Sequence, residues 1–290
     1  VLGKPLKVQF YVLKENAAGA EKLLDQAESF LDFFSRNFGQ YPWIKEKLGL
    51  VNTPYWGMEH QTIIAYGNKY KNNDKGYDFL LFHEMAHEWW GNYISVSDWA
   101  DLWIHEGFAV YAEALYLEEK YGIEEYNKFF RKKILKKIPL KQPIIPHRNA
   151  TMENVSGLDP YNKGAYVLHM LRYLLGDIKF FEILNEFLYI KKQLPNNQVN
   201  TKDFIDLVHK KTKTNIDWFF RVYLYEKDFP RLIQKTKHGS NHTFVELFWE
   251  NKNFSMPVDV FYNSNTGLRQ RRLSLSNKPT MIAIPQHNKI

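Results

Sequence analysis

The sequence predicts an α+β protein, in which a short strand-rich region precedes a mostly helical body and a small all-β tail ends the sequence. Three observations support this prediction. Apolar and polar residues alternate, as in strands, within 5–13 and 47–67. From Asp74 onward, apolar residues recur at spacings of three and four, as in amphipathic helices, for about 150 residues. After residue 230 the pattern returns to short alternating runs.

The N-terminal part combines strands with one helix. Residues 5–13 alternate as a strand, and residues 18–39 show an amphipathic pattern that ends at a glycine, so we predict a helix there. Within 47–67, Pro54 and Gly57 separate two extended runs, a pattern that is typical of a hairpin or of edge strands.

The helical body is predicted as seven consecutive helices, with glycines at several of their ends. They cover residues 76–90, 99–121, 123–137, 161–175, 177–192, 201–213 and 215–226. The segment 138–160 contains Pro, Asn and Gly and is predicted as a loop over a surface or a cleft. We therefore divide the chain into residues 1–230, which hold the strands and the helical body, and residues 231–290, a small β-sandwich.

Composition narrows the possible functions. Hydrophobic residues make up 44% of the chain, enough for packed cores, and no apolar run approaches the roughly 18 residues of a membrane span. The chain has no cysteine, which excludes disulfides and thiolate ligands, so any metal must be bound by His, Asp or Glu. The net charge is +7, but the main basic run, residues 131–141, has Ile and Leu at helical spacing. This spacing indicates a solvated helix face in preference to a site for nucleic acid or another anionic partner.

The most specific motif is HEMAHEWWGN at residues 83–92. On an α-helix, residues four apart lie about 40° apart around the axis, so His83 and His87 project from one face and can meet one metal ion. Glu84 lies beside His83, where it is suited to reach a water on the metal rather than the metal itself. The alternative is a core helix that carries a hydrogen-bonded pair of histidines.

A catalytic zinc site generally needs a third protein ligand, and the next predicted helix offers one. Glu106 follows His87 after eighteen residues, which accommodate a turn and the start of an antiparallel helix. The Gly and His that a metzincin requires after the second ligand are missing, so a third histidine is disfavoured, although His105 stays a lesser candidate. Glu113 lies two turns after Glu106 on the same face, either as a hydrogen-bond partner of a ligand imidazole or as a surface carboxylate.

These motifs together resemble the gluzincin aminopeptidases of the aminopeptidase N and leukotriene hydrolase family. The first shared feature is an H-E-x-x-H motif that is followed, after eighteen residues, by a glutamate in the sequence WIHEGFA. Upstream, GMEH at 57–60 is similar to the family's G-x-M-E-N exopeptidase motif, and YNKGA at 161–165 is similar to its Y-x-K-G-A segment. The resemblance covers about residues 5–230 in order and spacing. It implies a thermolysin-like catalytic domain over 1–230, with a small mixed sheet before a helical body, and the family's small sandwich domain over 231–290.

The resemblance also implies a function, that of a zinc-dependent aminopeptidase that hydrolyses the N-terminal peptide bond of peptides. It implies Zn²⁺ held by His83, His87 and Glu106. Glu84 would be the general base, taking a proton from the attacking water and later delivering it to the leaving amine. Tyr161 would stabilise the negative charge that develops on the scissile carbonyl oxygen.

A site for the free amine of the substrate is implied by the upstream motif. Glu59 would bind the α-ammonium, while the strand with Gly57 and Met58 would pair with the substrate main chain. His60, expected with these residues at the substrate site, stands where the family has Asn, either as a residue that positions the backbone or as a neutral contact. Trp56 stands where the family has its first Gly; these departures bear on turnover and first-residue preference. The expected partners are peptides with a free N-terminus and, because the family has a β-rich domain before the catalytic one, an N-terminal domain of the same protein. No nucleic-acid partner and no membrane span are expected for this chain.

Two other functions are compatible with these motifs. One is a zinc hydrolase that acts on a non-peptide, epoxide-type substrate, as in the leukotriene hydrolase branch. The other is a catalytically weak binding relative, against which Glu84 argues because a non-catalytic descendant has no need of that base. The compartment stays open, with the cell envelope or secretion favoured over the cytoplasm.

Overall fold

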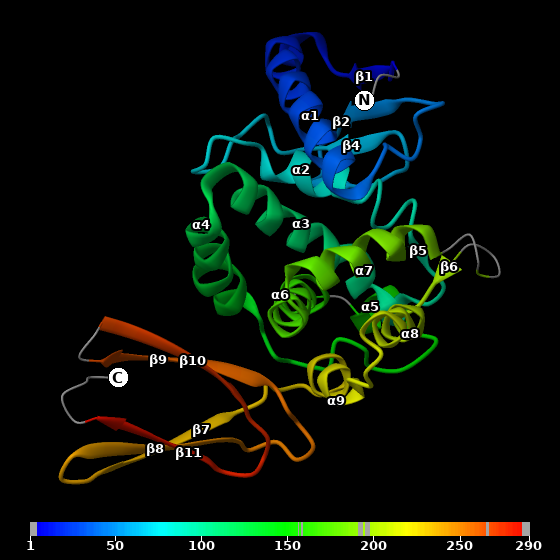
Figure 1. The fold of residues 1–290 in the computed structure, drawn as a ribbon. Helices are drawn as coiled ribbons and strands as arrows, with labels where there is room; N and C mark the ends of the chain where they lie inside the picture. Colours follow the sequence, from blue (N-terminus) through cyan, green and yellow to red (C-terminus); the bar gives the residue numbers. More distant parts are fainter. Residues whose placement is uncertain are drawn as a thin grey trace. The chain divides into compact units, whose positions relative to one another are not determined.

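The computed structural model describes residues 5–155, 157, 159–190, 194, 198–264 and 267–285. The chain divides into two compact units, residues 1–213 and residues 214–290 (Figure 1). Among the described residues, no helix is both long enough and apolar enough to cross a membrane.

The first unit begins with a small mixed sheet in the order β1–β2–β4–β3. β1, β2 and β4 run parallel, and β3 pairs antiparallel with β4 at one edge. The strands are β1 (Val8–Tyr11), β2 (Leu48–Asn52), β3 (Gly57–Met58) and β4 (Ile64–Tyr66). The predicted break between two extended runs is present, because the chain leaves β2 before Pro54 and β3 is a short edge strand that begins at Gly57.

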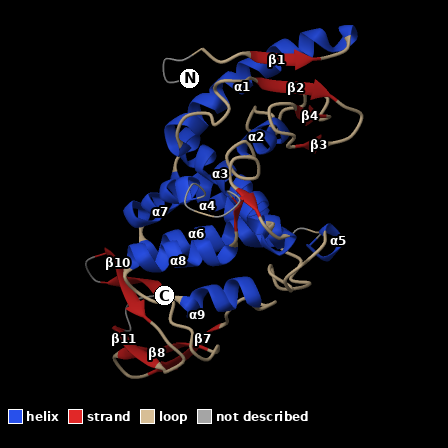
Figure 2. Ribbon diagram, turned by 90° about the vertical axis from the view of Figure 1, so that its right-hand side faces the viewer, coloured by secondary structure: helices blue, strands red, loops and turns tan. Residues whose placement is uncertain are grey.

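Helices form most of the rest of the first unit (Figure 2). Their order follows the sequence prediction closely, and the α+β class with a mixed sheet before a helical body is confirmed. The α-helices are α1 (Ala17–Phe38), α2 (Phe79–Ala86), α3 (Trp103–Tyr121), α4 (Ile123–Lys128), α5 (Met152–Val155), α6 (Gly164–Leu175), α7 (Asp177–Ile190) and α8 (Thr201–Thr212). A π-helix (Phe129–Ile134) and a 3-10 turn (Leu135–Lys137) continue α4, and a second π-helix (Asp159–Lys163) leads into α6. One further parallel pair joins β5 (Ser95–Val96) to β6 (Gln198–Val199).

Two predicted elements differ from the structure. The helix predicted for 76–90 is shorter, because α2 ends at Ala86. Beyond it, the backbone N–H groups of Asn92 and Ile94 donate to carbonyls five residues earlier, at 2.9 and 3.0 Å, so the chain widens into a looser turn. The segment 138–160, predicted as a loop, contains the short helix α5 and the start of the second π-helix.

An aromatic core between α1 and α2 sets the orientation of α2. Phe34 of α1 lies 4.8 Å from the ring of Phe82 and stacks at 5.0 Å on Trp89, which follows α2. All three side chains are buried. Aromatic pairs of this kind contribute about 0.5–1.5 kcal/mol each beyond their buried area. Because this face of α2 is held in the core, the neighbouring face, with His83, is directed toward Glu106 of α3.

The backbones of α3 and α6 touch at two glycines. A Cβ atom on Gly107 would lie 2.9 Å from the Cα of Gly164 and 3.1 Å from the carbonyl oxygen of Pro160, closer than real Cβ contacts allow. Only glycine therefore fits at position 107 without a shift of the backbone. This contact holds the π-helix before α6 directly against α3.

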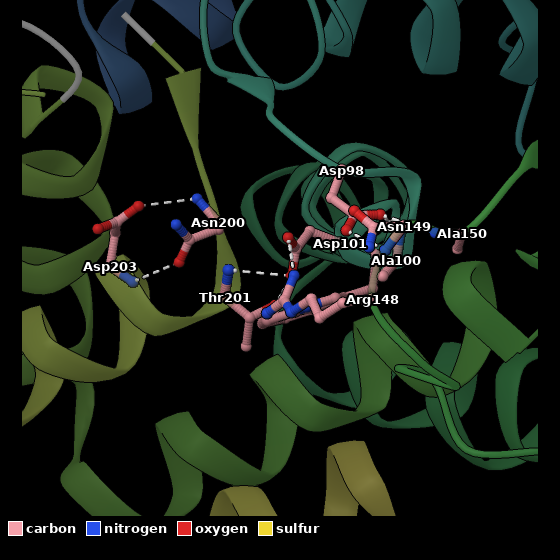
Figure 3. Close-up of polar contacts among 10 residues, drawn as sticks. Asp98, Ala100, Asp101, Arg148, Asn149, Ala150, Asn200, Thr201 and Asp203 are labelled. Atoms are coloured by element: carbon pink, nitrogen blue, oxygen red, sulfur yellow. Dashed lines mark hydrogen bonds and ion pairs between the residues drawn. The ribbon is translucent and has the colours of Figure 1, made fainter. Parts of the chain in front are cut away.

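The start of α3 is tied to distant segments by two aspartates (Figure 3). Asp98 accepts hydrogen bonds from the backbone N–H groups of Asn149 (2.6 Å) and Ala150 (3.1 Å). Asp101, which is fully buried, accepts from the backbone N–H (3.1 Å) and the hydroxyl (2.6 Å) of Thr201 at the start of α8. It also forms an ion pair with Arg148. The two carboxylates thus join the segment before Tyr161 and the start of α8 to the helix that carries Glu106.

The second unit begins with α9 (Asp217–Phe220) and a π-helix (Arg221–Tyr225) and continues as two antiparallel sheets. One sheet has the order β11–β8–β7 and the other pairs β10 with β9. The strands are β7 (Leu232–His238), β8 (His242–Trp249), β9 (Pro257–Ser264), β10 (Gly267–Ser274) and β11 (Thr280–Pro285). The all-β tail has the predicted strand pattern, while its arrangement as a sandwich stays a prediction.

The division between the units falls at 213/214, not at the predicted boundary after residue 230. The reason is aromatic packing within the second unit. Trp218 and Tyr223 lie 5.2 and 6.0 Å from the ring of Phe254, so the helical segment that precedes the strands packs with them. The assignment of a catalytic domain to 1–230 and a sandwich domain to 231–290 stays a prediction.

Candidate metal centre and substrate cleft

His83, His87 and Glu106 come together where α2 and α3 face each other. His83 lies in the last turn of α2, and His87 follows one turn later. Their Nε2 atoms are 3.2 Å apart. Glu106, in the first turn of α3, places its Oε2 atom 3.2 Å from Nε2 of His83 and 3.4 Å from Nε2 of His87.

The donor atoms of this cluster fit a tetrahedral zinc ion. Zinc bonds of 2.0–2.1 Å in tetrahedral geometry place neighbouring donor atoms about 3.3 Å apart, close to the three separations found here. Oε2 of Glu106 is buried and, among the described residues, has no hydrogen-bond partner. Nδ1 of His87 donates to the carbonyl of Trp90 at 2.8 Å, which leaves the lone pair of its Nε2 directed into the cluster.

The charges in the cluster favour a cation. Burial acts to lower the pKa of His87, but the carboxylates beside it, Glu106 above all, act in the other direction and together have the larger effect. The pKa of His87 is therefore raised, to about 10. Burial also acts to raise the pKa of Glu106, yet His87 and His83 hold it well below its usual range. Glu106 is therefore a carboxylate, and a metal ion would compete with the proton on the histidine.

His105, the lesser candidate for a third ligand, lies outside the cluster. Its Nε2 accepts a hydrogen bond from the backbone N–H of Val96 in β5 at 3.2 Å. Burial, together with the charge of His87, lowers the pKa of His105 to about 4, so it is neutral near pH 7. This hydrogen bond uses the lone pair that a metal would need, and the expectation that His105 could be a ligand is wrong.

Glu113 was expected either to hydrogen-bond a ligand imidazole or to be a surface carboxylate, and it does neither. Its carboxylate accepts from the hydroxyl of Tyr77 at 2.7 Å and from Nζ of Lys133 at 2.9 and 3.1 Å. It therefore does not hydrogen-bond a ligand imidazole. With 7% of its surface exposed, it is not a surface carboxylate either.

Glu84 is buried beside the cluster and is within reach of Glu59. Burial raises the pKa of Glu84 to about 6, while His83 and His87 oppose the shift. One carboxylate oxygen each of Glu84 and Glu59 and one ring nitrogen of His87 lie within 4.8 Å of one another. The site thus places a carboxylate of near-neutral pKa next to the three donor atoms and a second carboxylate at its edge.

Tyr161 is distant from the metal cluster in sequence but lies next to it in space. Its ring stacks on His83 with 6.1 Å between centroids and 21° between planes. Burial, reinforced by the Glu106 carboxylate, raises the pKa of Tyr161 well above its usual range. The phenol is therefore protonated at neutral pH and can donate a hydrogen bond.

The upstream motif forms the edge strand β3 and the turn after it. A Cβ atom on Gly57 would lie 2.5 Å from Oε1 of Glu84 and 2.9 Å from Leu80, so glycine lets β3 approach α2. The carbonyl of Glu59 accepts from the side-chain amide of Asn92 at 2.8 Å. His60 is exposed and is not among the residues that line the cleft.

Sequence reasoning missed Glu88, which follows the second histidine. Its buried carboxylate accepts from the backbone N–H of Thr62 at 3.0 Å, just after the GMEH motif. Burial raises the pKa of Glu88 to about 7. A charged residue at a core position of the motif helix is the signal that could have identified it, because buried carboxylates need partners.

A cleft of about 440 Å³ runs past the cluster. It is lined by the metal-cluster residues, by Glu84, Glu59 and Tyr161, and by side chains of β3, α2, α3 and the segments after α4 and before α6. These further lining residues include Trp56, Gly57, Met58, Phe79, Leu80, Trp99, Leu102, Val110, Glu113, Lys133, Ile134, Lys137, Met152 and Asn162.

Comparison with known proteins relates most of the first unit to one family. The model of the peptidase family M1 domain matches residues 23–223. Glutamyl aminopeptidase of Sus scrofa is 26% identical over 295 residues, which cover 92% of this chain and 30% of that protein. Human endoplasmic reticulum aminopeptidase 2 is 28% identical over 214 residues, which cover 67% of this chain and 22% of that protein. The chain thus spans less than a third of the length of these relatives.

Solved structures resemble the chain in fold. A mutant of an M1 zinc metallopeptidase from Deinococcus radiodurans, bound to a Tyr-Ser-Ala substrate, shares 25% identity with a TM-score of 0.60, over 71% of this chain and 45% of that one. Aminopeptidase A of Legionella pneumophila, in complex with aspartic acid, matches 98% of this chain and 34% of that one, with a TM-score of 0.76. At 15% identity, the latter likeness concerns the fold alone.

Proposed function

The chain belongs to peptidase family M1, whose domain model matches residues 23–223, and on this premise we propose that it is the catalytic part of a zinc-dependent aminopeptidase. The observation that carries the proposal is the cluster of His83, His87 and Glu106, with Glu84 beside it and Glu59 within reach. The relatives that it matches are aminopeptidases, which supports the same activity.

His83, His87 and Glu106 would hold the zinc ion. When bound, zinc supplies Lewis acidity that polarises the scissile carbonyl and activates water as a nucleophile. Glu84 takes a proton from the attacking water and delivers it to the nitrogen of the leaving amine. Burial raises the pKa of Glu84 above its ordinary value, which favours a carboxylate that can also hold the proton it transfers.

Tyr161 donates its phenol proton in a hydrogen bond to the carbonyl oxygen as this oxygen gains negative charge. The raised pKa of Tyr161 ensures that the donor keeps its proton. Because the π-helix of Tyr161 is held against α3 by the glycine contact, the donor needs little rearrangement when charge develops.

Glu59 binds the α-ammonium of the substrate and thereby makes the enzyme an exopeptidase. A carboxylate and an ammonium form a strong, charge-assisted hydrogen bond. Among the described strands β3 pairs with β4 alone, so its other edge, with Gly57 and Met58, can add the substrate main chain as a strand. A carboxylate at this place favours a peptide N-terminus over an epoxide, which has no ammonium group to bind.

The test combines metal analysis with hydrolysis of a panel of amino-acid anilides by the wild type and by Glu84→Gln. We expect about one zinc per chain in both, and a loss of activity of about 10²–10⁴-fold in Glu84→Gln, the usual contribution of a general base. Glu119→Gln, at an exposed position of α3, is the matched control and should keep wild-type activity. Anilides with an acetylated amine should not be cleaved, because they cannot pair with Glu59.

Equal activity in the wild type and Glu84→Gln would refute the mechanism. Absence of zinc from a folded wild-type chain supplied with the metal would refute the assignment of the ligands.

A further inference from the structure

The basic run at residues 131–141 contributes to the cleft as well as to the solvated surface. Lys133 and Lys137, one turn apart, are among the residues that line the cleft, whereas Lys132 and Lys136 are not. The prediction that this run is only a solvated helix face is therefore incomplete. Lys133 is partly exposed and Lys137 is exposed, yet both border the cleft, so their charges act on a ligand bound there.

Lys133 is held in a defined position. Its Nζ atom lies 2.9 and 3.1 Å from the two carboxylate oxygens of Glu113. It also lies 5.5 Å from the centre of the Phe79 ring and 4.8 Å from that of Phe129. An ammonium group has three donors, and Glu113 accepts at most two of them here. With 41% of its side chain exposed, Lys133 keeps a donor for a ligand in the cleft.

Lys137 adds an uncompensated positive charge. In the part of the chain that the structure describes, no carboxylate lies within ion-pair distance of its Nζ atom. The charge of Lys133 is balanced by Glu113, so this end of the cleft is positive overall. Glu84, with Glu59 beside it, lies five residues along α2 from Phe79, the ring next to which Lys133 lies. The cleft is thus acidic at the amine site and basic at its other end.

The free edge of β3 leads from the acidic end to the basic end. Glu59 lies beside Glu84 near the end of α2, and Gly57 lies against the same helix at Leu80. Trp56, the residue before β3, lies 5.8 Å from the ring of Phe79 at the start of α2. A peptide whose amine binds Glu59 and whose main chain follows this edge therefore extends toward Phe79, next to which Lys133 lies.

The length of the cleft corresponds to a short peptide. Seven residues separate Glu106 from Glu113, which is about 10 Å along α3 at 1.5 Å per residue. An extended peptide advances about 3.4 Å per residue. A terminal carboxylate two or three residues beyond the scissile bond, about 7–10 Å away, therefore comes within reach of the two lysines.

We propose that Lys133 and Lys137 bind the C-terminal carboxylate of the substrate, so that the cleft selects tripeptides and tetrapeptides with both ends free. The inference rests on the proposed aminopeptidase function and names the substrate class of the same site. The ends of such a peptide carry opposite charges that match the two ends of the cleft, and charge complementarity of this kind sets specificity.

The test compares a tripeptide of three alanines with its C-terminal amide, which differ only in the charge of the terminal group. For the wild type, we expect kcat/KM for the free acid to exceed that for the amide by about three- to tenfold, as for partly exposed charged contacts. In Lys133→Gln/Lys137→Gln the ratio should fall to about one. Lys132→Gln/Lys136→Gln changes the net charge equally outside the cleft and should keep the wild-type ratio. Lys133→Arg/Lys137→Arg retains the charges and should keep most of the preference.

Binding measurements separate this inference from the proposed function. Calorimetry on zinc-loaded Glu84→Gln measures the affinity for the acid and for the amide without turnover. If anilide hydrolysis is absent but the acid binds more tightly and the lysine variants abolish the difference, the carboxylate site stands while the catalytic proposal fails. If the wild type shows no preference for the acid in either binding or turnover, or if the control pair changes the ratio as much as the cleft pair, the carboxylate site is refuted.

Discussion

Replacement of Asp101 by alanine tests how the start of α3 is held in place. The side chain of Asp101 is fully buried and accepts two hydrogen bonds from Thr201, which is itself fully buried (Figure 3). Its other oxygen forms an ion pair at 2.5 Å with Arg148, whose side chain is 46% exposed. In Asp101→Ala, the two donors of Thr201 lose their acceptor inside the protein, whereas water can replace the partner of Arg148.

The expected loss of stability in each variant follows from this difference in exposure between Thr201 and Arg148. A buried donor left without a partner costs about 1–3 kcal/mol, and a partly exposed ion pair contributes about 0.2–1 kcal/mol. Asp101→Ala should therefore lower the free energy of unfolding by about 3–5 kcal/mol, and Arg148→Ala by less than about 1 kcal/mol. Thr201→Val keeps the backbone N–H but removes the hydroxyl, which also accepts from the buried Nε1–H of Trp103 at 2.8 Å, and should fall between the two.

Urea denaturation followed by far-ultraviolet circular dichroism measures these differences. Double-mutant cycles then apportion them: the coupling of Asp101 to Thr201 should be clearly larger than its coupling to Arg148. Two results would contradict this role of Asp101: Arg148→Ala as destabilising as Asp101→Ala, or a free energy of unfolding of Asp101→Ala within about 1 kcal/mol of the wild-type value. In the second case, buried donors would cost far less than about 1–3 kcal/mol.

Three further predictions follow from the site and the core. Gly57→Ala should lower peptidase activity roughly 10- to 100-fold at unchanged zinc content, because its Cβ would displace the Glu84 carboxylate; wild-type turnover would contradict this. Removal of zinc with a chelator should lower the thermal midpoint of unfolding and added zinc should restore it, since a ligand that binds only the folded state stabilises it; an unchanged midpoint would count against the site. Burial lowers the pKa of His169 to about 4, from 6.5 in the unfolded chain. Between these two pH values the unfolded chain binds more protons than the folded one. The free energy of unfolding should therefore fall by up to about 3 kcal/mol as the pH drops from 6.5 to 4. His169→Gln should reduce this pH dependence in urea titrations, and an identical pH profile would refute the assignment.

The sequence was sufficient to predict that His83, His87 and Glu106 come together, because the geometry that joins them is local. His83 and His87 are one helical turn apart, and Glu106 follows after a single turn of chain into the next helix, so helical geometry and one reversal bring the three together. The same periodicity predicted most helices to within a few residues. Their apolar stripes are as regular as that of α1, in which Leu23, Ala27 and Phe30 are buried at spacings of four and three.

Partners that come from other elements could not be predicted in this way. Glu113 lies on the expected face of α3, but its contacts are with Tyr77, which precedes α2, and with Lys133, which follows α4. Spacing within one helix carries no information about such neighbours. The early end of α2 has a different cause, which is local: beyond Ala86 the backbone N–H groups of Asn92 and Ile94 bond to carbonyls five residues back, a pattern that apolar periodicity does not distinguish from a helix.

The residues proposed for catalysis are close together in the sequence, whereas those proposed for substrate selection come from separate segments. The proposed ligands and the proposed base lie within residues 83–106, on two helices whose shared core orients them. Glu59, Tyr161 and Lys133 arrive from three separate segments, each fixed by a contact of its own: an amide of Asn92 on the Glu59 carbonyl, the glycine contact between α3 and α6, and the carboxylate of Glu113. If the proposed roles hold, a change in one of these contacts alters which peptide is bound while His83, His87 and Glu106 stay in place, because none of the three contacts includes their side chains.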